Sequence, residues 1–119
     1  MTGAAPGYAI GYLENIDVGS EIVEYIERIE ATFEPYGGRW LVHAKPHVTH
    51  EGSAPGDVVI IAFPSITAVR EWFDSEPYRA IAPLRIEHSD STILTVEGVA
   101  EAYRATTTAA TMRAGLQAR

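Results

Sequence analysis

Two adjacent glycines in the stretch Tyr36-Gly37-Gly38-Arg39 constrain the fold of this chain more than any other feature. A glycine readily takes the left-handed backbone conformation that commonly ends a helix. Apolar residues precede the two glycines at helical spacing: Ile22, Tyr25, Ile26, Ile29, Phe33 and Tyr36. The segment that follows, 39–45, alternates as a strand does. The junction therefore predicts an amphipathic helix followed at once by a strand.

Three further strands and a second helical region complete the prediction. Residues 8–14 and 91–97 have the composition of strands, and the apolar, β-branched run 57–63 is typical of a central strand buried on both faces. A helical region spans residues 65 to about 88. We expect it to be interrupted and restarted at Ser75-Glu76-Pro77, because proline suits the first turn of a helix.

The resulting order, β-α-β-β-α-β, indicates an α+β ferredoxin-like fold with a four-stranded antiparallel sheet and two helices on one face. The other sheet face needs a cover, so we expect a homodimer. Residues 1–98 would form this domain. The tail, residues 99–119, is rich in Ala and Thr and lacks apolar periodicity. It predicts a frayed helix or a disordered end, or alternatively a segment that docks on a partner.

Composition excludes several classes of function. The chain has no cysteine, so disulfides, thiolate metal sites and a thiol nucleophile are excluded. A net charge of −7 argues against binding to nucleic acid, which needs a basic surface. No apolar run approaches the roughly 18 residues that span a bilayer, and the first residues do not resemble a signal peptide. We expect a cytoplasmic protein without a membrane partner.

Several short motifs occur in a fixed order: Tyr36-Gly37-Gly38-Arg39 before an aliphatic strand, Glu51-Gly52, Phe63-Pro64-Ser65, Trp72 with Ser75-Glu76-Pro77-Tyr78, Arg85, and Val96-Glu97-Gly98. In this order and spacing, over residues 8–98, the chain resembles the family known as domain of unknown function 1330. The resemblance implies a dimeric α/β barrel, in which two ferredoxin-like sheets pack their bare faces together. The wider superfamily includes cofactor-free monooxygenases, lactone isomerases, polyketide cyclases, haem-degrading enzymes and stress-response proteins. Their small-molecule pockets commonly lie between sheet and helices.

The family supplies no agreed catalytic residues to carry over. After the aliphatic strand it usually reads Arg-Gly-Gly, whereas this chain has His43-Ala44-Lys45, followed by His47 and His50. This departure could mark a specialised member. The three histidines also suggest a metal, but their spacing matches no defined zinc pattern, so we expect no metal site.

Polar residues fall inside the apolar stripe of the second helical region. Tyr78, Ile81, Arg85 and His88 follow a 3-4-3 spacing and share one side of the helix. One interpretation is structural: Arg85 pairs with a carboxylate such as Glu14 or Glu97, and His88 caps the helix end. The other is functional, with Arg85 in a pocket wall, where it holds an anionic or carbonyl oxygen of a ligand.

His43 has a similar ambiguity. Strict alternation places His43 on one strand face with Arg39 and Leu41, and Trp40 on the opposite face with Val42. A hydrogen-bonded core histidine and a catalytic one are both consistent with this position. Histidine suits proton transfer near neutral pH.

The leading hypothesis is a homodimer that binds a hydrophobic or aromatic, polyketide-like carbonyl compound and catalyses cyclisation, isomerisation or lactone chemistry without a cofactor. The alternative is a non-catalytic ligand-binding or stress-associated dimer, and a third hypothesis is a cofactor-independent monooxygenase. In the leading hypothesis Tyr12 and Arg85 orient or stabilise an enolate oxygen. The candidate catalytic residues are His43 and His88, and the candidate substrate-binding residues are Tyr12, Arg39, Trp72, Tyr78 and Arg85.

Overall fold

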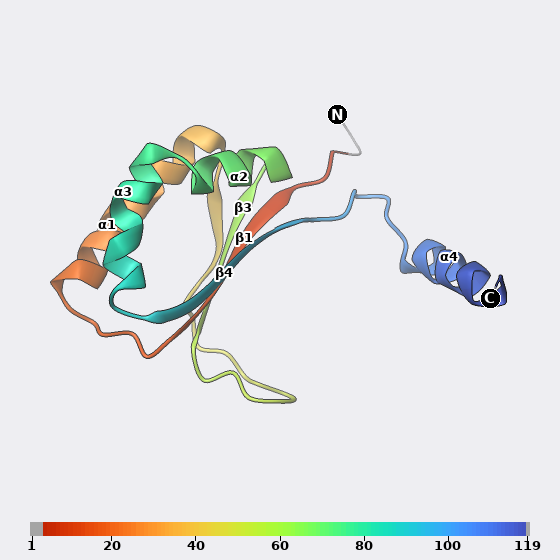
Figure 1. Cartoon of the computed structure of the whole chain (residues 1–119), viewed down its shortest axis with the longest axis horizontal. Coiled ribbons are helices and arrows are strands. Elements are labelled where there is room, and N and C mark those ends of the chain that lie inside the picture. Colours follow the sequence, from red (N-terminus) through yellow and green to blue (C-terminus); the bar gives the residue numbers. More distant parts are fainter. Residues whose placement is uncertain (1–3, 119) are drawn as a thin grey trace.

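The computed structural model describes residues 4–118 (Figure 1). Its elements are β1 (Gly7–Glu14), α1 (Ser20–Phe33), the short 3-10 helix η1 (Glu34–Tyr36), β2 (Arg39–His43), β3 (Asp57–Phe63), α2 (Ile66–Phe73), α3 (Glu76–Ile86), β4 (Asp90–Glu97) and α4 (Ala105–Gln117). Gly37 ends η1 with a φ of 78°, in the left-handed region that the junction required. The order from β1 to β4 is the predicted ferredoxin-like α+β fold, with the second helical region divided into α2 and α3.

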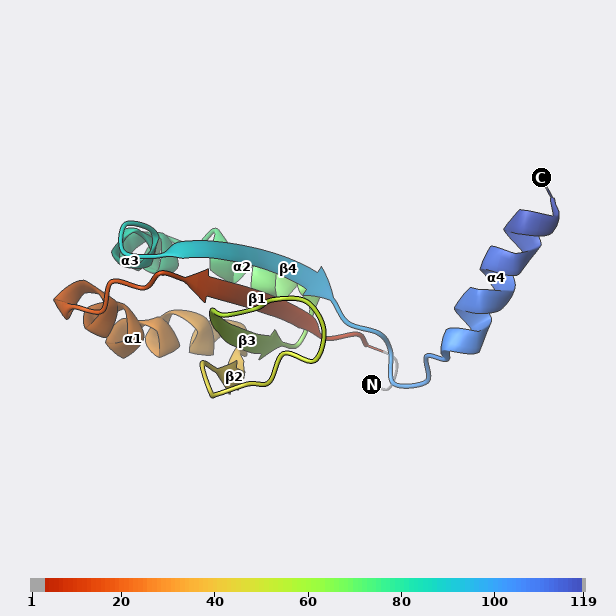
Figure 2. The same cartoon turned by 90° about the horizontal axis from the view of Figure 1, so that it is seen from below.

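The four strands pair in the order β2-β3-β1-β4, and every neighbouring pair is antiparallel. The helices α1, α2 and α3 lie on one face of this sheet, and no described helix crosses the opposite face (Figures 1 and 2). β3 and β1 are the central strands, as predicted for residues 57–63. We call the two sides of the sheet the helix-covered face and the bare face.

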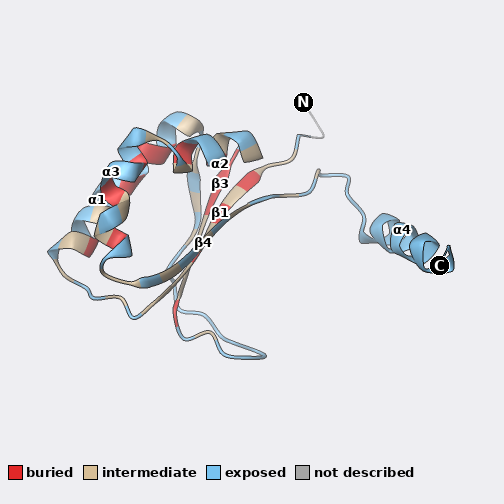
Figure 3. Cartoon of the chain, viewed as in Figure 1, coloured by how far each residue is buried: buried red, intermediate tan, exposed pale blue. Residues whose placement is uncertain are grey.

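The core lies between the sheet and the helices, where the buried positions of all three helices turn inward (Figure 3). Phe33, Trp72, Tyr78 and Ile81 meet Ile61 of β3 there, and each of these residues is at most 3% exposed. The bare face differs: in β3 it leaves Val58 and Ile60 only half-buried. The predicted burial of this strand on both faces is therefore incomplete in a single chain.

The restart of the second helical region follows from its caps. The Ser75 hydroxyl oxygen precedes α3 and accepts a hydrogen bond from the Tyr78 backbone N–H at 3.4 Å, with Pro77 in the first turn. Pro83 lies inside α3, which continues to Ile86. The new helix direction places Tyr78 and Arg85 over the sheet, where both are buried.

The strand β2 contains a β-bulge that corrects the predicted facing of its side chains. Trp40 pairs with Ile61 and Val42 pairs with the next residue, Ile60, so Leu41 is an extra residue without a partner. Because the bulge absorbs one residue, His43 falls on the same face as Trp40 rather than the opposite one. Their rings are stacked, with centroids 4.0 Å apart and planes 6° apart.

The C-terminal segment forms the helix α4, which stands apart from the sheet (Figure 1). Every described residue of α4 is exposed, including Met112 at 65% and Leu116 at 64%. Of the two predicted forms, a helix is the one observed, and the division into a domain and a tail at residue 98 stays a prediction. No helix among residues 4–118 has the length and apolar character that a membrane crossing requires.

Candidate functional site

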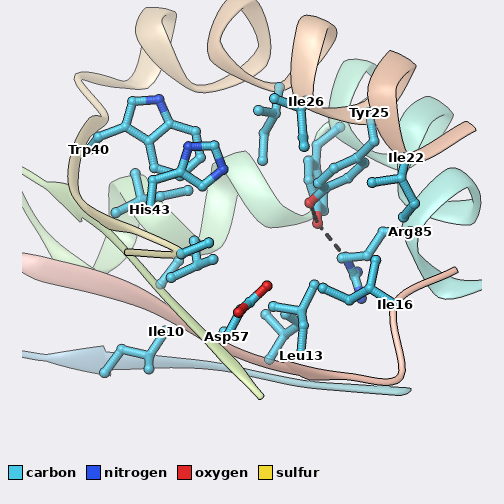
Figure 4. A pocket seen from close by; sticks show the side chains of 18 of the residues that line it. Ile10, Leu13, Ile16, Ile22, Tyr25, Ile26, Trp40, His43, Asp57 and Arg85 are labelled. Atoms are coloured by element: carbon cyan, nitrogen blue, oxygen red, sulfur yellow. Dashed lines mark hydrogen bonds between the residues drawn. The ribbon is translucent and has the colours of Figure 1, made fainter. Parts of the chain in front are cut away.

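An apolar cavity of about 110 Å³ lies between the helices and the sheet (Figure 4). Aliphatic and aromatic side chains form most of its wall. Its ionisable lining residues are Tyr25, His43, Asp57, Tyr78 and Arg85. A dry cavity of about 150 Å³ is known to hold a benzene molecule. The cavity of this protein is smaller than that one, so it suits a compact molecule with an apolar body below the size of benzene and a few polar groups.

Arg85 is the most unusual residue of this wall, because it is charged and only 4% exposed. Its Nη1 donates to the Ser91 hydroxyl oxygen at 2.6 Å, and its Nη2 donates to the Tyr78 hydroxyl oxygen at 3.3 Å. Its buried Nε has no hydrogen-bond partner. Within residues 4–118 no carboxylate lies at ion-pair distance from it. The expected pairing of Arg85 with a carboxylate such as Glu14 or Glu97 is therefore wrong.

Tyr25 and Tyr78 extend the polar cluster around Arg85. Their hydroxyl oxygens are 2.8 Å apart. A guanidinium only donates hydrogen bonds, so Tyr78 accepts from Arg85 and can direct its own proton to Tyr25. The Tyr25 proton is then available to a ligand. Burial, followed by the neighbouring Tyr78, raises the pKa of Tyr25, so this hydroxyl group stays neutral.

His43 lines the same cavity from the side opposite Arg85 (Figure 4). Its imidazole stacks on the indole of Trp40, and the Trp40 Nε1 donates to the Glu30 carboxylate at 2.7 Å. His43 itself is exposed, as expected for a residue of an edge strand at the rim of a pocket. The bulge at Leu41 is what directs the imidazole to the helix-covered face.

Two of the predicted binding residues lie elsewhere. Tyr12 pairs with Val58, on the bare face, and its hydroxyl accepts a hydrogen bond from the Gly56 backbone N–H at 2.7 Å. Arg39 pairs with Ala62, which also belongs to the bare face. Neither residue lines the cavity. Strict alternation had grouped Arg39 with His43, and the bulge separates them.

The other predicted residues divide between the cavity wall and the helix end. Trp72 and Tyr78 line the cavity, although Trp72 is also a core residue whose Nε1 donates to the Thr32 hydroxyl at 2.9 Å. His88 does not line it. The His88 Nδ1 donates to the Leu84 carbonyl at 2.9 Å, and its Nε2 lies 3.9 Å from a Glu21 carboxylate oxygen. This geometry agrees with the helix-end interpretation of His88.

Sequence reasoning missed Tyr25 and Asp57 as parts of the site. Tyr25 belongs to the apolar stripe of α1, and its only signal is a hydroxyl group among aliphatic residues. The position of Asp57 in the sequence indicates only that it begins a strand, and the register places it on the helix-covered face with Val59. Among residues 4–118, no group of three or more His, Cys, Asp or Glu side chains is arranged to hold a metal ion.

Solved structures share the fold at low sequence identity. A protein of unknown function from Rhodopseudomonas palustris is 19% identical with a TM-score of 0.59, over 78% of this chain and 82% of that chain. A protein from Thermobifida fusca, described as dimeric, ferredoxin-like and of unknown function, is 11% identical with a TM-score of 0.56, over 81% and 93%. A conserved protein from Methanosarcina mazei is 10% identical with a TM-score of 0.53, over 82% and 95%. These likenesses support the fold alone.

Comparison with curated proteins gave no match. The family model described as Domain of unknown function (DUF1330) matches residues 6–99, which contain the whole sheet and the helices α1 to α3. This match confirms the resemblance seen in the sequence motifs. The chain therefore belongs to the DUF1330 family.

Proposed function

We propose that this protein is a small-molecule enzyme that uses acid–base chemistry, without a cofactor, on a compact carbonyl compound with an apolar body. One observation carries the proposal: His43 and Arg85 line the same apolar cavity from opposite sides. A proton-transfer group and a buried positive charge on two sides of one small ligand are the parts that such chemistry needs.

In the proposed reaction the neutral His43 imidazole takes a proton from the carbon next to the substrate carbonyl. The electron pair of the broken C–H bond forms the enolate, whose negative charge resides mainly on oxygen. The Tyr25 hydroxyl donates a hydrogen bond to this oxygen, and the charge of Arg85 stabilises it. Tyr25 thus takes the role that the sequence had suggested for Tyr12.

The enolate then has two outcomes. In a substrate with a carbon–carbon double bond conjugated to the enolate, return of the proton from His43 to the far carbon of this dienolate gives an isomer of the substrate. Alternatively, the enolate carbon attacks a second carbonyl group of the same molecule, a carbon–carbon bond forms, and the new alkoxide takes the proton from His43. The second outcome is a cyclisation, and neither outcome consumes an oxidant or a cofactor.

A second candidate function, ligand binding without catalysis, is favoured by the setting of His43. Among the described residues, no hydrogen bond orients the imidazole, and only its stack on Trp40 holds the ring. Enzymes that use a histidine base usually fix the tautomer through the other ring nitrogen. In this reading Arg85 and Tyr25 bind the polar end of a ligand and no bond is broken.

We further propose that the working form is a homodimer in which the bare faces pack together. Large apolar residues of β4, Leu94 and Val96, remain 45% and 41% exposed on that face. Exposed apolar surface of this kind marks an interaction site. The Thermobifida fusca protein of similar fold is described as dimeric, which supports the same assembly here.

The proposal is tested by hydrogen–deuterium exchange at carbon. Small ketones and oxo acids are incubated with the protein in D₂O, and the loss of the proton signal next to the carbonyl is followed by NMR. We expect the wild-type protein to exceed His43→Ala by at least about 100-fold, the contribution of a positioned general base. The control is His50→Ala, because His50 is exposed and does not line the cavity.

Two results would contradict the proposed catalysis. Equal exchange rates for the wild-type protein and a folded His43→Ala variant would remove His43 as the base. Binding of the compounds without any acceleration of exchange would favour the non-catalytic candidate. His43→Ala should lose no more than about 0.5–1.5 kcal/mol in the free energy of unfolding, the contribution of an aromatic pair, so the variant should stay folded.

A further inference from the structure

Arg85 is a buried cation, and no carboxylate of the described residues lies at ion-pair distance from it. Its contacts satisfy two of the three guanidinium nitrogens, but both acceptors, the Ser91 and Tyr78 hydroxyl groups, are neutral. Neutral acceptors supply hydrogen bonds without cancelling the charge. A charge held in apolar surroundings without a counter-charge is costly, and proteins usually pair it. Arg85 therefore has no counter-charge in direct contact, and its hydrogen bonding is incomplete.

Two donors remain free at this end of the cavity. The Arg85 Nε is buried and has no partner. The Tyr25 proton is available when Tyr78, which accepts from Arg85, donates its own proton to the Tyr25 oxygen. The Arg85 guanidinium carbon lies 5.8 Å from the centre of the Tyr25 ring, and both residues line the cavity. Two adjacent donors, one of them charged, match the two oxygens of a carboxylate.

The rest of the wall restricts the anion further. Asp57 lines the same cavity (Figure 4), and its carboxylate repels any anion there, so a single ligand charge next to Arg85 is tolerated better than two. Hydrocarbon and aromatic side chains, such as Ile22 and Val59, form most of the remaining wall. Phosphate or sulfate would lose its hydration against such a wall and meet a single cation.

We infer that the cavity binds a compact monocarboxylate with a small branched or ring-shaped hydrocarbon body, whose carboxylate accepts from the Arg85 Nε and the Tyr25 hydroxyl. The inference rests on the proposed function for the site and adds the charge of the ligand, which a carbonyl compound need not have. In an oxo acid the carboxylate and the reacting carbonyl adjoin, so the single Tyr25 proton would bind the carboxylate in the resting complex and move to the neighbouring enolate oxygen during the reaction, while the Arg85 Nε keeps the carboxylate.

The test compares carboxylates with amides of the same shape. Isobutyrate against isobutyramide, and cyclopropanecarboxylate against cyclopropanecarboxamide, are titrated into ¹⁵N-labelled protein, and the Nε–H signal of Arg85 is followed by NMR. We expect the carboxylates to bind at least about tenfold more tightly, because a hydrogen bond to a charged group is worth more than one to a neutral group. The Arg85 Nε–H signal should move on binding.

Matched variants locate the effect. In Arg85→Met the preference for the carboxylate should fall to within about twofold of the amide, since the positive charge is gone. Arg79→Met removes an exposed arginine of the same helix and should leave the preference intact. Tyr25→Phe keeps the ring, loses the hydroxyl proton, and should weaken carboxylate binding several-fold.

Three outcomes would overturn the inference: equal affinity for carboxylate and amide, no binding of either carboxylate by the wild-type protein, or an unchanged preference in Arg85→Met. The inference and the proposed catalysis fail separately. Carboxylate binding without exchange of carbon-bound protons contradicts only the catalysis. If neutral ketones bind as tightly as carboxylates and exchange their protons in a reaction that depends on His43, only the carboxylate inference is contradicted.

Discussion

The two faces of the sheet contrast sharply in how far one chain completes them. On the helix-covered face, Ile61 of β3 is 2% exposed beneath Trp72, which is also 2% exposed. On the bare face, Leu94 of the edge strand β4 is 45% exposed, although it is as apolar as the residues of the core. The strands are the same, so composition does not cause the difference. What differs is the presence of a covering layer.

The contrast indicates that the helix-covered face determines the stability of the single chain and that the bare face determines its assembly. A single chain obtains its packed core from the helix-covered face, and this face also holds the cavity. The bare face contributes little until another surface covers it. Substitutions on the first face should therefore change the free energy of unfolding, and substitutions on the second should change the assembly.

The largest effect is expected for Trp72→Ala. The variant removes a buried indole and leaves the Thr32 hydroxyl, its hydrogen-bond acceptor, without that partner. We expect a loss of about 3–5 kcal/mol in the free energy of unfolding, measured by urea denaturation followed by circular dichroism. The matched variant Trp40→Ala, at a half-buried position on an edge strand, should lose clearly less. Equal losses would mean that the core extends over both tryptophans.

The next effect concerns the bare face. Leu94→Asp should weaken the proposed dimer by about 100-fold or more, because an unpaired carboxylate would be buried between the sheets. The folded chain should survive, since the residue is half-exposed there. Sedimentation over a range of concentrations measures the change, and Val23→Asp, 49% exposed on α1, is the control. If the wild-type protein already sediments as a single chain at micromolar concentration, the dimer is wrong.

A smaller effect, opposite in sign to a normal core substitution, is expected for Arg85→Met. The variant replaces an unneutralised buried charge by an apolar side chain of similar length. The free energy of unfolding should stay the same or rise by about 1 kcal/mol, even as the preference for carboxylates is lost. Thermal denaturation without ligand measures this. A drop of about 3 kcal/mol or more would show that Arg85 is needed for the fold itself.

The smallest effect is expected from removal of the tail. In a chain that ends at residue 100 the melting temperature should change by less than about 4 °C, because every described residue of α4 is exposed. Calorimetry of the two chains at equal concentration tests this. A fall of more than about 8 °C would mean that α4 packs against a surface, and the first surface to test would be that of a second subunit.

The fold could be predicted because its boundaries are set locally. Glycine at residue 37 and the Ser75-Glu76-Pro77 restart act through their own backbone, so a sequence pattern reports them directly. The site could be predicted only in part. The facing of His43 depends on how β2 pairs with β3, which local alternation does not encode. The lack of a carboxylate beside Arg85 depends on tertiary packing. Tyr25 resembles any core residue of an amphipathic helix until Tyr78 is placed against it.

The bulge at Leu41 has a consequence for the way in which members of the family are aligned. A relative whose second strand is regular and one residue shorter has its gap opposite Leu41, since the pairs on either side of it, Trp40 with Ile61 and Val42 with Ile60, are consecutive on β3. An alignment without that gap would match His43 to a side chain directed into the other layer of the molecule. One residue of that alignment column would then face the cavity and the other would face the opposite side of the sheet. Conservation in the column would carry no information about the chemistry of the cavity.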